Sequence, residues 1–191
     1  PHPISSCETL LGLREFLPYF AEQAMDVAII DTPWNGVWQS MKIVAAAEHF
    51  EVNVAPHNFY GHLCTMMNAH FCAAVPNLRI METDIDRLAW DHELFTHVPE
   101  FVDGHLVIPD RPGWGTEPNE DGLRALNARG LRSRGYSVIE AANGVEALEA
   151  FEEKNGAVDL VVSDVVMPEM DGLATMQHIR QLPRGRELPM R

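Results

Sequence analysis

The chain has 191 residues, of which 46% are hydrophobic and 22% are charged, and its formal net charge is −14 at pH 7. This length suits one ordinary domain or two small ones, and the hydrophobic content supports a buried core. The chain has no apolar run of about 18 residues, the length that spans a bilayer, and its first residues lack the features of a signal peptide. We therefore expect a cytoplasmic protein with no membrane partner.

Acidic charge is concentrated in the first part of the chain. Residues 1–118 carry 5 basic and 16 acidic side chains, whereas residues 119–191 carry 9 and 12. A nucleic-acid phosphate backbone needs a basic surface, so neither part suits that partner. The first part also holds three cysteines, Cys7, Cys64 and Cys72. They form no CxxC pair, which argues against a zinc site or a disulfide framework and predicts buried thiols.

Short apolar runs recur in the first part at a spacing of 22 to 26 residues. They begin near Ile4, Asp26, Glu51 and Asn77. Three segments between them place apolar residues at the i, i+3, i+4 and i+7 positions of a helix packed on one face. These segments are residues 11–23, 37–49 and 60–74. The alternation predicts an α/β fold of parallel βα repeats, and four such units make half of a (βα)8 barrel.

A polar side chain stands at the end of each predicted strand. These residues are Glu8, Asp31, His57 and Glu82. Catalytic groups of such barrels sit where the carboxyl ends of the strands converge on one mouth. Each position alone also suits a helix cap or a loop residue, but the set of four favours a functional site. His62 begins the next helix, where it suits either the same mouth or a packed helix start.

Five stretches of the first part resemble the enolase superfamily, in its mandelate racemase and sugar-acid dehydratase branch. They are PISSCETLLG, DVAIIDTPWNG, VNVAPHNFYGHL, NLRIMETD and DGHLVIPDRPGWGTEPNE, and the resemblance extends to about residue 125. It implies that Glu8 is a carboxylate ligand of Mg²⁺. It also implies that Asp31 orients the imidazole of His57 as a catalytic dyad. Glu82 is implied to bind the carboxylate of a small acid-sugar substrate, or the enolate that develops from it.

The implied chemistry accounts for these residue types. Removing a proton beside a carboxylate creates a dianionic enolate, which a divalent cation and a hydrogen-bond donor must stabilise. Mg²⁺ prefers carboxylate oxygens, and a histidine backed by a carboxylate suits proton transfer near neutral pH. Trp34 and Asn35 follow the second strand and are candidates for lining the substrate. The catalytic lysine, two further metal carboxylates and the capping domain of the family have no counterpart here, so we expect negligible turnover from this polypeptide alone.

Residues 120–191 predict a second unit that alternates helices and strands. The expected helices are residues 121–134, 145–154 and 173–182, and the expected strands are residues 136–141 and 159–164. Both strands are continuous apolar runs, which is typical of a sheet covered on both faces.

The stretch DLVVSDVVMPEMDG, with RGYSVIEAANGVEALEAF before it, resembles the receiver domain of response regulators, close to the receivers of hybrid histidine kinases. The resemblance implies a partial flavodoxin-like unit. Asp164 is the implied phosphoryl acceptor from a histidine kinase or phosphotransfer protein, and Asp164 and the carbonyl of Val166 are implied Mg²⁺ ligands. The alternative is a simple strand-end carboxylate. The acidic pair that follows the first strand of a receiver is missing at residues 118–119, and the fourth strand is expected to begin near Leu188.

Three hypotheses for the whole chain follow, with a boundary between residues 1–119 and 120–191. The first is a phosphorelay receiver fused to an inactive barrel fragment. The second is a Mg²⁺-dependent sugar-acid dehydratase that uses Asp31 and His57. The third is a non-functional or engineered chimera. The strands of the two parts are expected either to join into one mixed sheet with a common core or to leave the half-barrel with open edges, which favour a homodimer or aggregation.

Overall fold

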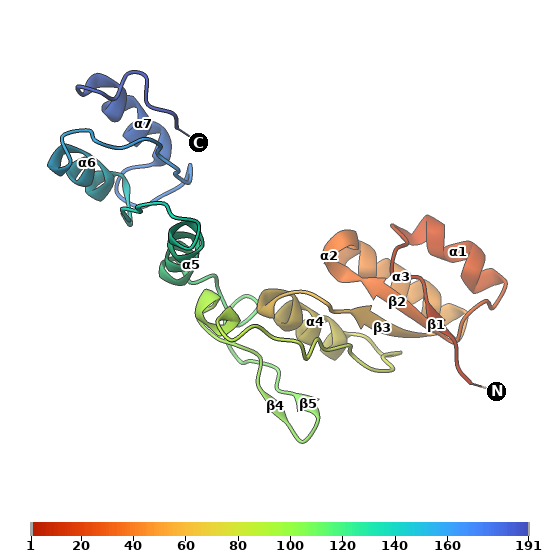
Figure 1. The fold of residues 1–191 in the computed structure, drawn as a ribbon. Coiled ribbons are helices and arrows are strands. Elements are labelled where there is room, and N and C mark those ends of the chain that lie inside the picture. Colours follow the sequence, from red (N-terminus) through yellow and green to blue (C-terminus); the bar gives the residue numbers. More distant parts are fainter. Residues whose placement is uncertain (1, 191) are drawn as a thin grey trace. The chain divides into compact units, whose positions relative to one another are not determined.

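The computed structural model describes residues 2–190 and divides the chain into two compact units, Pro1–Asn119 and Glu120–Arg191. Figure 1 traces both units in chain order. The predicted α/β class is confirmed, with a parallel sheet and flanking helices. Within the described range, every helix is too short or too polar to cross a membrane.

The sheet of the first unit has three parallel strands in the order β1-β2-β3. They are β1 (Ser5–Ser6), β2 (Val27–Asp31) and β3 (Asn53–His57). The fourth predicted strand is reduced to one parallel bridge between Val54 and Leu78. The backbone still pairs at Arg79, whose N–H donates to the Val54 carbonyl, but the carbonyl of Glu82 accepts from the side chain of Asn58 instead. The predicted half-barrel order is thus present, with a shortened last strand.

The three helices predicted from the apolar spacing connect these strands, and a short additional helix precedes the second of them. They are α1 (Leu13–Ala21), the additional α2 (Thr32–Asn35), α3 (Val37–His49) and α4 (His62–Ala74). The 3₁₀ helix η1 (Asp91–Leu94) and the hairpin strands β4 (Phe101–Val102) and β5 (His105–Leu106) follow. Figure 1 shows this hairpin as a projection of the chain beyond α4. Asp103 and Gly104 both have positive φ at its turn, as a tight two-residue hairpin loop requires.

The core of the first unit lies between the sheet and the helices. Phe16 and Phe20 of α1, Ile30 of β2 and Ile43 of α3 are fully buried in one cluster, and Phe71 of α4 joins them. Burying one such side chain stabilises the fold by about 1.5–3 kcal/mol. This cluster therefore fixes β2 at the centre of the unit and holds the carboxyl ends of β2 and β3 in place.

The three cysteines are free thiols, and each is partly rather than fully buried, which corrects the sequence expectation. The reason is position, because Cys7 and Cys72 pack against the edge of the core cluster instead of its centre. Burial is still sufficient to raise the pKa of Cys72 to about 12.

The second unit contains the three predicted helices, α5 (Glu120–Arg132), α6 (Gly144–Glu153) and α7 (Gly172–Gln181). Asn143 and Asp171 cap α6 and α7, because each side chain accepts a hydrogen bond from a first-turn N–H. α6 packs against α7 around Phe151 and Ile179, with Leu188 completing the cluster.

The two strands predicted in this unit, residues 136–141 and 159–164, are not formed as ladders. Within residues 120–190 the bridge between Val161 and Met190 is the one strand-like pairing. In flavodoxin-like sheets of order 2-1-3-4-5, the first strand lies between the second and the third. The residues that precede α5, where a first strand would stand, belong to the first unit instead. There the N–H of Asn119 donates to the Leu94 carbonyl. Without a central partner, neither segment forms a ladder.

Candidate functional site

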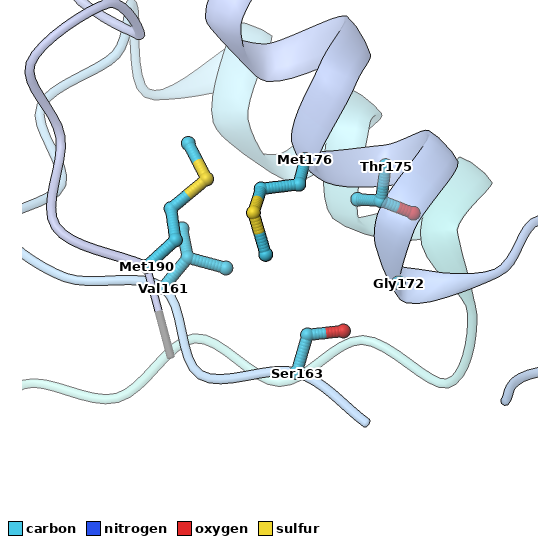
Figure 2. A pocket seen from close by; sticks show the side chains of 6 residues that line it. All are labelled: Val161, Ser163, Gly172, Thr175, Met176 and Met190. Atoms are coloured by element: carbon cyan, nitrogen blue, oxygen red, sulfur yellow. The ribbon is translucent and has the colours of Figure 1, made fainter. Parts of the chain in front are cut away.

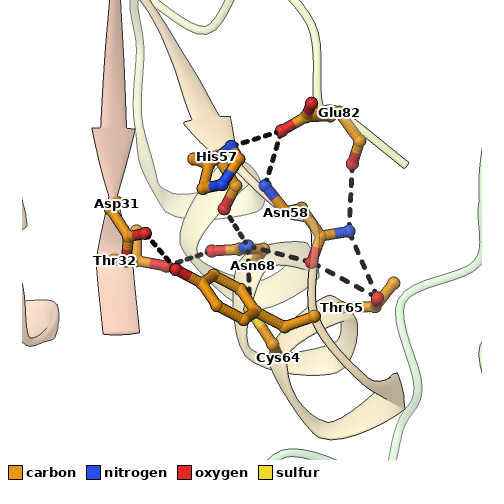
Figure 3. Close-up of polar contacts among 9 residues, drawn as sticks. Asp31, Thr32, His57, Asn58, Cys64, Thr65, Asn68 and Glu82 are labelled. Atoms are coloured by element: carbon orange, nitrogen blue, oxygen red, sulfur yellow. Dashed lines mark hydrogen bonds and ion pairs between the residues drawn. The ribbon is translucent and has the colours of Figure 1, made fainter. Parts of the chain in front are cut away.

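The carboxyl ends of β2 and β3 bring Asp31 and His57 directly opposite each other in the sheet register. Neighbouring parallel strands present such residues at the same edge, as predicted from the sequence. The two side chains nevertheless have different partners, which Figure 3 shows.

The imidazole of His57 pairs with Glu82, with Nδ1 2.7 Å from Oε2. The same carboxylate oxygen accepts the backbone N–H of Asn58 at 2.8 Å, and the Asn58 side chain donates to the Glu82 carbonyl at 3.0 Å. Glu82 is thus attached to the loop after β3 at two points. The carboxylate that contacts His57 in this structure is therefore Glu82, whereas the family resemblance implied Asp31.

Asp31 is 1% exposed, and both of its carboxylate oxygens are occupied by other groups. Oδ1 accepts the backbone N–H of Trp34 at 2.9 Å and caps α2, while Oδ2 accepts the hydroxyl of Tyr60. These two bonds explain why Asp31 does not orient His57. Burial, and next the hydrogen bond to Asp31, raises the pKa of Tyr60 to about 12, so this hydroxyl stays protonated.

A buried amide, Asn68 of α4, links the ends of both strands. Its Nδ2 donates to the His57 carbonyl at 3.1 Å and to Asn58 Oδ1 at 3.3 Å, and its Oδ1 accepts the hydroxyl of Thr32. Asn68, Asn58 and Thr32 are all 0% exposed. Sequence reasoning missed this network. Its signal was the polar spacing His62, Thr65, Asn68 on the buried face of a helix, because buried polar groups need partners.

His62 lies beside the mouth but faces a different segment. Its side chain is buried, with Nε2 3.1 Å from Oδ1 of Asp91 and the ring edge-on to Phe95 at 5.7 Å. Arg87 also lies beside Asp91, with Nη1 3.9 Å from Oδ2, and donates to the Tyr60 carbonyl at 2.9 Å. The sequence left two roles open for His62, lining the substrate or packing at the start of a helix. Its contacts with Asp91 and Phe95 support the packing role.

Trp34 and Asn35 occupy α2, which follows Asp31. The Trp34 side chain is 59% exposed. Asn35 accepts the N–H of Gly12 at 2.7 Å and donates to the Leu10 carbonyl at 3.2 Å. These two bonds join α2 to the loop before α1. The role of Asn35 in this structure is therefore to hold the backbone of that loop.

Glu8 lies in a separate shallow groove at the end of β1. The groove is lined by Ser6, Cys7, Glu8, Thr9, Leu10 and Tyr19. Of these lining residues, Glu8 alone carries a carboxylate, and Mg²⁺ requires several oxygen ligands. No group of three or more His, Cys, Asp or Glu side chains suited to a metal occurs among residues 2–190. The described residues therefore do not by themselves fit the implied magnesium site.

Asp164 is exposed at the end of the segment 159–164. The loop after it folds back, because the Gly172 N–H donates to the Val165 carbonyl at 2.9 Å. A Cβ added at Gly172 would overlap the Asp164 carbonyl oxygen, so glycine is required for this close approach. Val166, the other implied metal ligand, is 89% exposed.

A small cavity lies beside this segment and is drawn in Figure 2. Its lining residues are Val161, Ser163, Gly172, Thr175, Met176 and Met190. Most of the side chains that face it are apolar. Val161 and Met190, which line it, are also the two residues of the single strand bridge in this unit.

Comparison with known proteins assigns a family description to each part. Residues 1–122 match the family described as enolase C-terminal domain-like, and residues 119–190 match the family described as response regulator receiver domain. Both resemblances drawn from the sequence are confirmed.

Individual relatives agree with this division. Sensor kinase CckA of Brucella abortus is 59% identical over 63 residues, which are 33% of this chain and 7% of that protein. D-xylonate dehydratase of Haloferax volcanii is 31% identical over 109 residues, which are 56% of this chain and 26% of that protein. A crystal structure from Burkholderia xenovorans strain LB400, bound to magnesium and fumarate and provisionally assigned as an L-alanine-DL-glutamate epimerase, is 73% identical with a TM-score of 0.64. That match covers 65% of this chain and 31% of the other, so the chain spans less than a third of each of these relatives.

Proposed function

Because the chain belongs to the enolase C-terminal domain-like family over residues 1–122 and carries a response regulator receiver domain over residues 119–190, we propose that it acts in a phosphorelay. Asp164 is the proposed phosphoryl acceptor, and the donor is a histidine kinase or a phosphotransfer protein. The observation that carries this proposal is the exposed carboxylate of Asp164 at the point where the receiver-like segment ends.

The proposed step is a phosphoryl transfer to oxygen. A carboxylate oxygen of Asp164 attacks the phosphorus atom of a phosphohistidine, and an acyl phosphate forms. The P–N bond breaks, and the departing imidazole keeps the bonding electron pair and takes up a proton. Residues 120–190 contain no cluster of metal-ligating side chains around Asp164, so we expect the transfer to be slow.

Intact mass spectrometry of the whole chain tests this proposal. After incubation with acetyl phosphate, with and without Mg²⁺, we expect the mass of one phosphoryl group to be added and to be lost on treatment with hydroxylamine. Asp164→Asn should abolish the addition. Asp159→Asn is the matched control, because it removes an exposed carboxylate from the same segment and should leave the addition intact. An addition that persists in Asp164→Asn would exclude Asp164 as the acceptor.

For the first unit we propose a barrel fragment without turnover of its own. The similarity to D-xylonate dehydratase and the pairing of His57 with Glu82 support a site that once handled a sugar acid. The groove at Glu8 offers one carboxylate, which is too few ligands to hold Mg²⁺.

An assay with D-xylonate and Mg²⁺ tests this second proposal. Loss of water from a sugar acid gives an enol that becomes a 2-keto acid, which can be detected as its semicarbazone. We expect no product above the level of His57→Ala, which lacks the imidazole. Magnesium-dependent product that disappears in His57→Ala would show that the unit is a working dehydratase.

A further inference from the structure

The hydrogen bonds around the barrel mouth form a closed circuit. Asn68 donates to Asn58, Asn58 donates twice to Glu82, and Glu82 accepts from the ring of His57. The circuit closes where Asn68 donates to the His57 carbonyl. Figure 3 shows these four side chains converging: Asn68 from α4, His57 from β3, Asn58 from the loop after β3, and Glu82 from the segment after α4.

This circuit determines which nitrogen of His57 carries the proton in the neutral ring. A carboxylate only accepts hydrogen bonds, so Nδ1 must be the donor toward Glu82. Nε2 is then the nitrogen with the lone pair, and it can accept a proton. The ring cannot easily turn to reverse these roles, because it packs edge-on to Tyr60 at 5.6 Å with an interplanar angle of 79°.

We propose that Asn68 is a positioning residue for this site: through Asn58 it holds the Glu82 carboxylate on Nδ1 of His57 and so makes Nε2 the proton-accepting nitrogen. Asp31, whose oxygens are taken by Trp34 and Tyr60, has no part in this orientation. The inference concerns the geometry of the barrel mouth, and it is independent of phosphoryl transfer at Asp164.

The tautomer of His57 is directly measurable. In water the neutral imidazole of histidine prefers the Nε2–H form, so dominance of the Nδ1–H form is a signature of the Glu82 contact. A hydrogen bond to a charged group is strong enough for about a tenfold preference or more. Long-range ¹H–¹⁵N spectra of the full chain, recorded where the ring is neutral, distinguish the two forms. We expect Nδ1–H in the natural chain and a return to predominantly Nε2–H in Asn68→Ala.

A matched variant separates positioning from general loss of stability. Asn77 is also a partly buried asparagine of this unit, and its side chain donates to the carbonyls of Val44 and Val52, away from the mouth. Asn77→Ala should lower the melting temperature but leave the Nδ1–H form of His57 unchanged. If Asn77→Ala converts the tautomer as Asn68→Ala does, the effect is loosening of the fold and the proposal fails.

Two further results decide the matter even if Asn68→Ala does not fold. An Nε2–H tautomer in the natural chain overturns the proposal without any substitution. Asn58→Ala tests the same circuit from its middle, because it removes the side chain that receives from Asn68 and donates to Glu82. Loss of the Nδ1–H form in Asn58→Ala supports the proposal, and its retention contradicts it.

Discussion

Burial near the barrel mouth raises the pKa of two neighbouring acids, the Cys64 thiol and the Tyr60 hydroxyl, each to about 12. After burial, the negative charge of Asp31 is the next cause of the raised pKa of Cys64, whereas for the pKa of Tyr60 the next cause is its hydrogen bond to Asp31. Arg87 acts in the opposite direction on Cys64. A thiol held protonated in this way is a poor nucleophile, so Cys64 contributes packing to the mouth and not reactivity.

The thiol of Cys72 provides a pH-dependent test of the fold. Its pKa is raised to about 12 in the folded chain, whereas an unfolded cysteine ionises near about 8.5. Above that pH the unfolded state binds fewer protons than the folded state, so the free energy of unfolding falls as pH rises from about 9 toward 12. Below about 8.5 the contribution is fully present.

Urea unfolding at several pH values measures this effect. Cys72→Ala should reduce the slope of the free energy of unfolding against pH above about 9, since it removes one of the groups with a raised pKa. The comparison is between slopes, because the substitution also lowers stability at every pH through lost packing. An unchanged slope would mean that the thiol is accessible to water in the folded chain.

At the scale of elements, the sequence predicts helices, which depend on local contacts, better than strand pairing, which depends on distant segments. The apolar spacing of residues 37–49 predicts α3 with the bounds that the structure gives, because a helix satisfies its hydrogen bonds within its own segment. Residues 159–164 have an equally strong strand pattern but form a single bridge, between Val161 and Met190, and no ladder. The apolar pattern therefore predicts a buried strand but does not predict its hydrogen-bonded neighbour.

The same distinction applies to the candidate site. The strand ends placed Asp31 and His57 side by side, and the register confirms that position. The partner of His57 could not be predicted, because it depends on where the chain goes after Arg79 and on the backbone N–H and side chain of Asn58, which both bind Glu82. The spacing of the sequence thus predicts which residues lie at the strand ends. The hydrogen bonds among these residues can be found only from the three-dimensional structure.

Two glycines of the second unit should respond to alanine in opposite directions. Gly130 lies inside α5, where an added Cβ would meet only the end of Arg134 at 3.8 Å. Gly130→Ala should therefore stabilise the unit by about 0.5–1 kcal/mol, through the lower conformational entropy of the unfolded chain. Gly172→Ala should destabilise it by about 1–3 kcal/mol, because the new Cβ overlaps the Asp164 backbone.

Thermal unfolding of each variant, followed by circular dichroism, measures both effects. The acetyl phosphate reaction adds a second readout, since Gly172→Ala displaces the loop beside Asp164 and should slow its modification. Gly130→Ala should leave that reaction unchanged. Equal effects of the two substitutions on stability would contradict the close approach of Gly172 to Asp164.

At the scale of the whole molecule, the segment 159–164 pairs at Val161 and otherwise exposes apolar side chains. Leu160 is 48% exposed and Val162 is 70% exposed, and Val165 and Val166 beyond them are 72% and 89% exposed. Exposed backbone donors and acceptors beside apolar side chains form a template for pairing with another chain. We therefore predict that the chain self-associates through this segment.

A single charge should prevent this association. Val162→Lys places an ammonium group on the exposed edge, a substitution that natural sheets use to block edge pairing. Size-exclusion chromatography with light scattering should show species larger than one chain for the natural protein and a single chain for Val162→Lys. The matched control is Leu131→Lys, because Leu131 is a 40% exposed apolar residue on a helix, whose backbone groups are already paired. Leu131→Lys should still associate, and loss of association in both variants would assign the effect to net charge and not to the open edge.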